Sequence, residues 1–215
     1  MNNSPKVSII IPVHNAEKYL EQSVGGLINQ TLKDIEIICV DDASTDDSLR
    51  ILNDYAKRDS RVKVFHHDAS KSALGARKTG VLAAKGEYIM FLDADDYFAN
   101  DACEIIYDKI LETNVEILHF PMSVDNIGNI SEEKIISLCE YTKPYKETLV
   151  NEQIFEYCFE KNIYKHTLVN KVYKSDLCKK AYSKTEDIHM IFDHLMMSIF
   201  KEHLTQIEGR KNGKI

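Results

Sequence analysis

The sequence lacks the patterns that mark several common classes of protein. Its 215 residues include five cysteines without any close pair, which argues against both a disulfide framework and a zinc knuckle. It has no long basic run, and 27 basic against 34 acidic residues give a formal net charge of −7. Nucleic acid is therefore not an expected partner. The apolar runs are too short to span a bilayer and no secretory signal is present, so we expect a cytoplasmic location.

Common enzyme fingerprints are also missing. The glycines form neither a Rossmann nor a P-loop pattern, and no Gly-x-Ser-x-Gly elbow marks a nucleophilic serine. Among the histidines, His66 and His67 are adjacent, while His189 and His194 lack the spacing and the glutamate of a zinc-protease helix. We therefore expect most histidines at the surface or at the edge of the core.

The first part of the chain instead alternates between strand and helix patterns. Strands are predicted at residues 7–13, 35–40, 62–65, 88–92 and 115–120, and helices at 16–29, about 49–55, 74–84 and 101–113. We expect Lys85 and Gly86 to end the helix at 74–84. This alternation predicts an α/β fold with a mainly parallel, Rossmann-like sheet flanked by helices.

The second part of the chain gives weaker signals. Residues 122–150 read as an excursion from the sheet with turn and loop chemistry. A strand is predicted at residues 168–173 and helices at 154–159 and 186–200. Residues 208–215 are polar and are expected to form a flexible tail.

Three carboxylates directly follow the predicted strand at 88–92. Alternation along an extended chain would place Asp93 and Asp95 on the same side. Two such oxygen ligands suit Mg²⁺ or Mn²⁺, provided that a substrate diphosphate completes the coordination shell. The alternative is that these acids only cap the helix that follows near Asp101.

Four segments in this order closely resemble the family 2 glycosyltransferases, which have the GT-A fold. The match extends over about residues 7–120, and the combination is more specific than Asp-x-Asp alone. It implies a nucleotide-sugar donor, usually a UDP-sugar, with Mg²⁺ or Mn²⁺ at Asp93 and Asp95. The segments are Val7-Ser8-Ile9-Ile10-Ile11-Pro12-Val13-His14-Asn15, Val40-Asp41-Asp42-Ala43-Ser44-Thr45-Asp46, Gly75-Ala76-Arg77-Lys78-Thr79-Gly80 and Phe91-Leu92-Asp93-Ala94-Asp95-Asp96.

The resemblance also implies roles for residues that bind the donor. Pro12, His14 and Asn15 would lie on the nucleotide-binding loop, although His14 stands where the family often has tyrosine. Either Asp41 or Asp42 would accept a hydrogen bond from the imide N–H of uracil, and both also read as acids at a helix start.

Arg77 corresponds to an arginine that would reach the diphosphate. The alternative is an arginine that is simply exposed on its helix.

In the second half, Asn170-Lys171-Val172-Tyr173-Lys174 and the later Glu186-Asp187 resemble two family motifs. The resemblance implies that Asp187 is the catalytic base, with Glu186 as the first substitute. The alternative for Asp187 is a negative charge favoured at a helix N-terminus. Residues 1–121 would then form the nucleotide-sugar-binding half of one domain, and residues 122–207 the acceptor-side half.

These features predict an inverting, metal-dependent glycosyltransferase. It would move a sugar to a glycan or lipid-linked acceptor in the biosynthesis of a surface polysaccharide or lipo-oligosaccharide, either free in the cytoplasm or peripheral at the inner face of the membrane. One alternative is a truncated or inactive nucleotide-sugar-binding protein, because the C-terminal half is short for the family. A nucleotidyltransferase is a further alternative, but the segment after the first strand lacks the expected Gly- and Arg-rich loop.

Overall fold

The computed structural model describes residues 4–123, 131–141 and 168–183. The helices expected at 154–159 and 186–200 and the tail at 208–215 lie outside these ranges. By contacts the chain forms two compact units, one with residues 1–118 and 171–182 and the other with residues 119–170 and 183–215. The first unit holds nearly all of the sheet and most of the predicted site residues.

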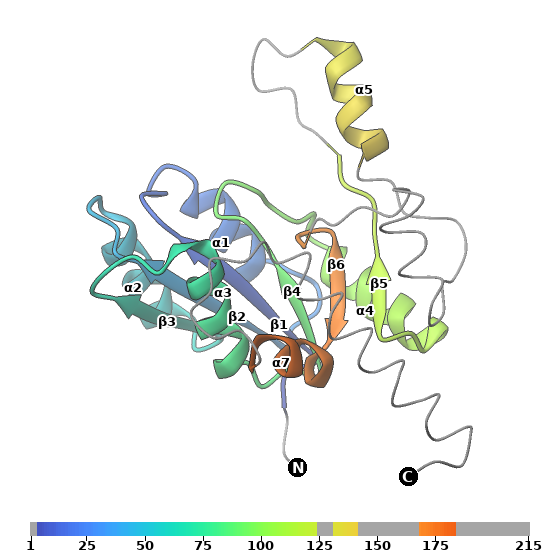
Figure 1. Ribbon diagram of the computed structural model, residues 1–215, viewed down its shortest axis with the longest axis horizontal. Helices are drawn as coiled ribbons and strands as arrows, with labels where there is room; N and C mark the ends of the chain where they lie inside the picture. Colours follow the sequence, from blue (N-terminus) through green and yellow to red (C-terminus); the bar gives the residue numbers. More distant parts are fainter. Residues whose placement is uncertain (1–3, 124–130, 142–167, 184–215) are drawn as a thin grey trace. The chain divides into compact units, whose positions relative to one another are not determined.

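The described strands form one six-stranded sheet in the order β3-β2-β1-β4-β6-β5 (Figure 1). The four N-terminal strands are paired in parallel, whereas β6 runs antiparallel to β4. The expectation of a mainly parallel sheet is therefore confirmed. The strands are β1 (Val7–Val13), β2 (Ile35–Asp42), β3 (Val62–His67), β4 (Tyr88–Phe91), β5 (Ile117–His119) and β6 (Lys171–Lys174).

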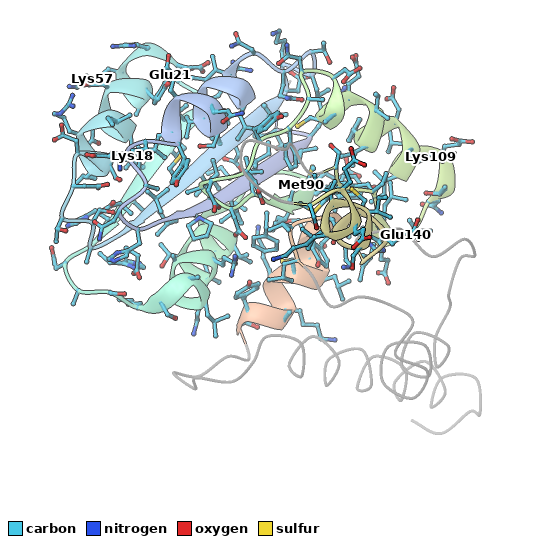
Figure 2. All side chains as sticks on the ribbon, turned by 90° about the horizontal axis from the view of Figure 1, so that it is seen from above. Lys18, Glu21, Lys57, Met90, Lys109 and Glu140 are labelled. Atoms are coloured by element: carbon cyan, nitrogen blue, oxygen red, sulfur yellow. The ribbon has the colours of Figure 1, made fainter. Side chains whose placement is uncertain are left out.

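Helices cover both faces of this sheet. Figure 2 shows α1 (Leu20–Ile28), α2 (Ser48–Arg58) and α4 (Ala102–Thr113) on one face, and α3 (Ser72–Ala83) and α7 (Ser175–Ser183) on the other. Lys57 and Lys109 extend outward from α2 and α4, while Met90 lies within the sheet (Figure 2). Because both faces are covered, nearly every residue of β1, β2 and β4 is buried, as is typical of parallel strands.

Two helices were not predicted from the sequence. In α7 the apolar residues Leu177, Cys178, Ala181 and Tyr182 are buried, but the helix is so short that the pattern gives a weak signal. The other is α5 (Glu132–Tyr141), which belongs to the second unit. It lies in the region expected to be an excursion from the sheet with turn and loop chemistry, and Ile136 on it is 63% exposed.

Gly86 does not end a helix, as the sequence had suggested, but packs directly against β1. Helix α3 ends at Ala83. The Gly86 N–H donates to the Ser8 hydroxyl at 2.8 Å and to the buried Glu36 carboxylate at 3.1 Å. A Cβ atom at Gly86 would lie 2.6 Å from the Ser8 backbone nitrogen. This close approach of two backbones explains why glycine occupies the position.

Replacing Gly86 by alanine should therefore destabilise the protein by about 1–3 kcal/mol, because the added methyl group overlaps backbone and forces the chain to shift. Gly26 in α1 is a matched control, since a Cβ there would meet nothing within 4 Å. Alanine in a helix interior is favoured over glycine by roughly 0.5–1 kcal/mol, so Gly26→Ala should be neutral or stabilising. Urea unfolding of the two variants measures both effects. A Gly86→Ala protein as stable as Gly26→Ala would contradict this explanation.

Candidate active site

The predicted site residues from the first half of the chain gather at one edge of the sheet. The parallel strands β1, β2 and β4 end there, which is where open α/β sheets bind ligands. Pro12 lies inside β1, opposite Val40 of β2, rather than after the strand. Pairing of β1 with β4 covers only Val7 to Ile10. Pro12 lies beyond the end of this pairing, so its lack of an N–H removes no hydrogen bond to β4.

The loops that follow β1 and β2 are hydrogen-bonded to each other. His14 Nδ1 lies 2.7 Å from the Asp42 carbonyl oxygen, and His14 Nε2 lies 3.2 Å from Asn15 Nδ2. Since the carbonyl can only accept, Nδ1 carries the proton and Nε2 accepts from the Asn15 amide. The Asn15 side-chain oxygen accepts from the Thr45 N–H at 2.8 Å. His14 and Asn15 are both exposed, and these hydrogen bonds hold them in place at the strand ends.

Asp41 and Asp42 belong to β2 itself, whereas the sequence had suggested that the strand ends at Val40. Their cross-strand neighbours in β3 are His66 and His67. The Nδ1 atom of His66 lies 2.8 Å from an Asp41 carboxylate oxygen, and that of His67 lies 2.7 Å from Asp42 Oδ1. These hydrogen-bond partners explain how two acids can occupy a buried strand. His67 is buried, at 6% exposure, whereas His66 beside it is partly exposed.

The two carboxylates have different surroundings. Asp42 accepts further hydrogen bonds from the Ser70 hydroxyl at 2.6 Å and the Lys71 N–H at 2.8 Å. Burial alone would raise the pKa of Asp42, but the hydrogen bonds from His67, Lys71 and Ser70 outweigh it and lower the pKa. The carboxylate is therefore ionised at neutral pH. Asp41 is fully buried, and in the described part of the chain its Oδ1 atom has no hydrogen-bond partner.

Helix α3 brings Arg77 to the carboxylates that follow β4. Arg77 Nη2 donates to Asp93 Oδ1 at 2.6 Å, and the arginine side chain is only 17% exposed. Arg77 is thus not the freely exposed arginine of the alternative reading. Burial raises the pKa of Tyr182 in α7 well above its usual value, and the nearby positive charge of Arg77 offsets part of this rise. Arg77 therefore lies in a mostly buried position at the start of the acidic segment.

The acidic segment itself turns rather than continuing as a strand. The Asp96 N–H donates to the Asp93 carbonyl at 3.0 Å, so the expected extended alternation of Asp93 and Asp95 is wrong. Asp95 at the turn is exposed. Burial raises the pKa of the Asp96 carboxyl, and the negative charges of Asp95 and Asp93 raise it further. The turn therefore concentrates negative charge at one point.

The far end of this acidic loop is anchored by Gln30, which is fully buried at the end of α1. Its Nε2 donates to the Ala99 carbonyl at 2.7 Å, and its Oε1 accepts from the Cys103 N–H at 3.0 Å. The second bond satisfies one of the free N–H groups in the first turn of α4. Arg77 therefore anchors the start of the acidic loop at Asp93, and Gln30 anchors its end at Ala99 and Cys103.

The carboxylates fit a divalent cation that has few protein ligands. Within the described ranges, no group of three or more His, Cys, Asp or Glu side chains is arranged to hold a metal ion. Asp95 is exposed, and Asp93 forms an ion pair with Arg77. A hard cation such as Mg²⁺ often takes only one or two carboxylates and completes its shell with waters and substrate phosphates. A cation here would also relieve the repulsion that raises the pKa of Asp96.

Comparison with known proteins places this geometry in a family. The model of the family described as "Glycosyl transferase family 2" matches residues 8–173. The chain belongs to glycosyl transferase family 2. The match begins in β1 and ends in β6, and so covers all of the strand ends described above.

Several curated glycosyltransferases resemble about half of the chain. An uncharacterized glycosyltransferase of Haemophilus influenzae is 42% identical over 117 residues, which are 54% of this chain and 47% of that protein. The poly(ribitol-phosphate) beta-glucosyltransferase of Bacillus spizizenii is 47% identical over 115 residues, 52% of this chain and 18% of that protein. The chain thus spans less than half the length of these relatives.

Solved structures show that the family 2 chain has the GT-A fold. TarS residues 1–349 of S. aureus, in complex with UDP, superposes with a TM-score of 0.68 at 24% identity, covering 91% of this chain and 55% of that one. The mannosyltransferase PcManGT of Pyrobaculum calidifontis, in complex with GDP-Man and Mn²⁺, gives a TM-score of 0.62 at 16% identity, covering 91% and 52%. The fold expected from the sequence is therefore confirmed.

Two predicted site residues, Glu186 and Asp187, lie outside the described residues, and their roles stay predictions. Sequence reasoning also missed two residues, His67 at the end of β3 and Gln30 just after α1. His67 had a usable signal, because strands β2 and β3 end in the dipeptides Asp-Asp and His-His and parallel pairing sets these opposite each other. Gln30 had none, since its partners are main-chain atoms about 70 residues away along the chain.

Proposed function

We propose that this family 2 chain transfers a sugar from a nucleotide-diphospho-sugar to an acceptor hydroxyl, with inversion at the anomeric carbon. The observation that carries the proposal is the convergence of Asp41, Asp42, Arg77, Asp93 and Asp95 at one edge of the sheet. A nucleoside diphosphate needs an acceptor for its base and positive charge for its phosphates. This edge offers buried carboxylates that would accept a hydrogen bond from the base, and an arginine beside an acidic turn that would hold a cation near the phosphates.

The donor is proposed to be a UDP-sugar. The TarS structures of the same fold contain UDP and UDP-GlcNAc, and the imide N–H of uracil suits a carboxylate acceptor. Pro12, His14 and Asn15 would line the nucleotide site, since the loops that carry His14 and Asn15 are bonded to the end of β2. Mg²⁺ or Mn²⁺ on Asp95 and Asp93 would supply the positive charge that stabilises the departing diphosphate.

In the proposed mechanism, Asp187 removes the proton from the acceptor hydroxyl as the hydroxyl oxygen attacks the anomeric carbon. A bond forms from that oxygen to the anomeric carbon while the bond to the diphosphate oxygen breaks. Direct displacement inverts the anomeric centre. Arg77 orients Asp93 through their ion pair and keeps the acidic turn in place. Glu186 is the substitute base if Asp187 is not the proton acceptor.

The acceptor is proposed to be a glycan or lipid-linked intermediate of a surface polysaccharide. Relatives named for such polymers support this, including the poly(ribitol-phosphate) beta-glucosyltransferase and the chondroitin synthase of Escherichia coli, 41% identical over 105 residues. In the described part of the chain, no helix is long and apolar enough to cross a membrane. We propose action in the cytoplasm, with peripheral contact at the membrane where a lipid-linked acceptor requires it.

A second candidate is a nucleotide-sugar-binding protein without turnover, for which the side chains at the strand ends would suffice. One experiment separates the two. The protein is incubated with Mn²⁺ and a panel of nucleotide sugars, and both hydrolysis of the donor and thermal stabilisation are measured. Hydrolysis of one donor supports the enzyme, stabilisation without hydrolysis supports the binding protein, and neither effect with any donor contradicts both.

Recognition of the base should depend on the carboxylates at the end of β2. Replacing the Asp that binds the base with alanine should weaken UDP binding by roughly 1.5–3 kcal/mol, the range for a hydrogen bond to a charged group. CDP and ADP should bind wild-type protein less well than UDP. Isothermal titration calorimetry of Asp41→Ala and Asp42→Ala identifies the residue. A protein that binds the three diphosphates equally, or that is unaffected by either change, would rule out this role.

A further inference from the structure

A line of hydrogen bonds connects the end of β2 with helix α3. The carboxylate of Asp42 is bonded to His67 Nδ1 at 2.7 Å, and His67 Nε2 lies 2.9 Å from the hydroxyl of Thr79 in α3. Two residues before Thr79, the same helix carries Arg77, which is paired with Asp93. His67 therefore stands between the carboxylate proposed for the base and the helix proposed for the diphosphate.

Hydrogen-bonding chemistry fixes the direction of the first contact. The Asp42 carboxylate is ionised, because its hydrogen bonds lower its pKa despite burial, and it can therefore only accept. His67 Nδ1 must carry a proton and donate. At Nε2 the ring either accepts from the Thr79 hydroxyl or donates to it. When the ring donates, the hydroxyl proton can point to the Gly75 carbonyl oxygen at 3.2 Å. The ring thus keeps both partners with either charge.

The same carboxylate also orders the segment that leads into α3. The Ser70 hydroxyl and the Lys71 N–H both donate to Asp42, and the Ser72 N–H donates in turn to the Ser70 hydroxyl at 3.3 Å. Ser72 has a φ angle of 67°, a backbone conformation that a non-glycine residue adopts only when its surroundings hold it. Movement of the Asp42 carboxylate would therefore disturb the start of α3 as well as the end of β2.

A nucleophilic role for this Asp-His-Thr set is disfavoured by its surroundings. The three side chains have the order of a catalytic triad. However, Thr79 is in the middle of α3, and its hydroxyl lies within hydrogen-bond distance of a main-chain carbonyl of its own helix. His67 and Asp42 are 6% and 4% exposed. A buried ring bonded at both nitrogens is suited to holding its neighbours in place.

We propose that His67 is a positioning residue for the donor nucleotide. It orients the Asp42 carboxylate and, through Thr79, fixes α3 so that Arg77 and Asp42 are correctly spaced for the two ends of a nucleoside diphosphate. The proposal rests on the proposed function, because it assumes that this edge binds a nucleotide. It does not assign any step of the reaction to the histidine.

Two substitutions separate the two bonds of the ring. In His67→Asn, the amide places an N–H near the position of Nδ1 and keeps the bond to Asp42. In His67→Gln, the longer side chain reaches the position of Nε2 and keeps only the bond to Thr79. Thr79→Val removes the hydroxyl and keeps the shape of the side chain. Thr113→Val is the matched control, because the Thr113 hydroxyl also donates to a carbonyl of its own helix, at 2.8 Å, but lies exposed on α4.

The measurement is the Kd of UDP with Mn²⁺ by calorimetry, with a melting curve for each variant. His67→Gln should weaken UDP binding about tenfold, which is the lower end of the range for a lost hydrogen bond to a charged group. His67→Asn should recover most of this affinity. Thr79→Val should weaken UDP binding by a smaller factor. The double variant with His67→Gln should bind UDP no more weakly than His67→Gln alone, because both changes break the same series of hydrogen bonds from Asp42 to Thr79. Thr113→Val should bind like the wild type.

Three outcomes would overturn the inference, and they distinguish its failure from the failure of the proposed function. If the wild type binds UDP and folded His67→Gln binds it equally well, His67 only fills space and the proposed function survives. If His67→Asn and His67→Gln lose affinity equally, the bond from Nδ1 to Asp42 does not position the nucleotide, and the proposed function again survives. If the wild type binds no nucleoside diphosphate with Mn²⁺, the proposed function fails and the positioning role fails with it.

Discussion

Replacing Asp95 by alanine should abolish both turnover and metal-dependent UDP binding. Asp95 is exposed at the turn after β4, and without a cation the acidic turn would repel an anionic diphosphate. Loss of the metal removes several kcal/mol of charge stabilisation in the transition state, so the rate should fall by roughly a thousandfold or more. EDTA should have the same effect on wild-type protein. Steady-state assays and UDP titrations, each with and without Mn²⁺, measure these losses.

Asp101 provides a matched control for Asp95. It lies in the same loop and precedes α4, but its side chain makes no capping hydrogen bond. Asp101→Ala therefore removes the same charge from the same loop without removing a proposed ligand, and its turnover should match the wild type. Equal UDP affinity with and without metal, or equal activity of Asp95→Ala and Asp101→Ala, would exclude the metal role proposed for the acidic turn.

Replacing Asp187 by asparagine should separate catalysis from donor binding. A general base typically contributes 10²–10⁴-fold to a rate, so turnover should fall by about that factor. Metal-dependent UDP affinity should stay nearly unchanged, because the proposed base acts on the acceptor. The measurement combines kcat, KM and a UDP titration on the same preparation.

The alternative for Asp187, an acid that only favours a helix N-terminus, predicts a different result. Asparagine is also a good N-cap, so Asp187→Asn would then be close to neutral in rate and in stability. Asp176 in the first turn of α7 is a matched control for such an effect, and Asp176→Asn should leave turnover unchanged. Unchanged turnover in Asp187→Asn would move the base elsewhere, with Glu186→Gln as the next variant to assay.

Much of the first unit was predictable because its signals are local. Runs of apolar residues predicted the first four strands, and the acids after them predicted the edge where ligands bind. The error at β2 has a physical cause. Asp41 and Asp42 were read as a loop because carboxylates are rare in buried strands, yet the histidines of β3 supply the hydrogen bonds that they need. A pattern read along one strand contains no information about its neighbour.

The features that were missed depend on contacts between distant residues. The sequence showed that residues 168–173 favour a strand, but not that β6 lies antiparallel between β4 and β5. Gly86 was read as a helix stop because glycine is common there, while its actual reason is the backbone of β1. Arg77 could be placed near the site by resemblance, but its ion pair with Asp93 depends on how closely α3 packs on the sheet.

The place of β6 in the sheet also determines the order in which the protein can fold during synthesis. β6 is the last described strand in the sequence, yet it separates β4 from β5. Strands β1 to β4 leave the ribosome first and can pair at once, but β5 has no neighbour until Lys171–Lys174 has been made. Until then, the open edge of β4 exposes unpaired main-chain groups of an apolar strand, which can pair with another chain. We therefore expect the nascent chain to be prone to aggregation during the synthesis of about eighty residues, from the end of β4 to β6.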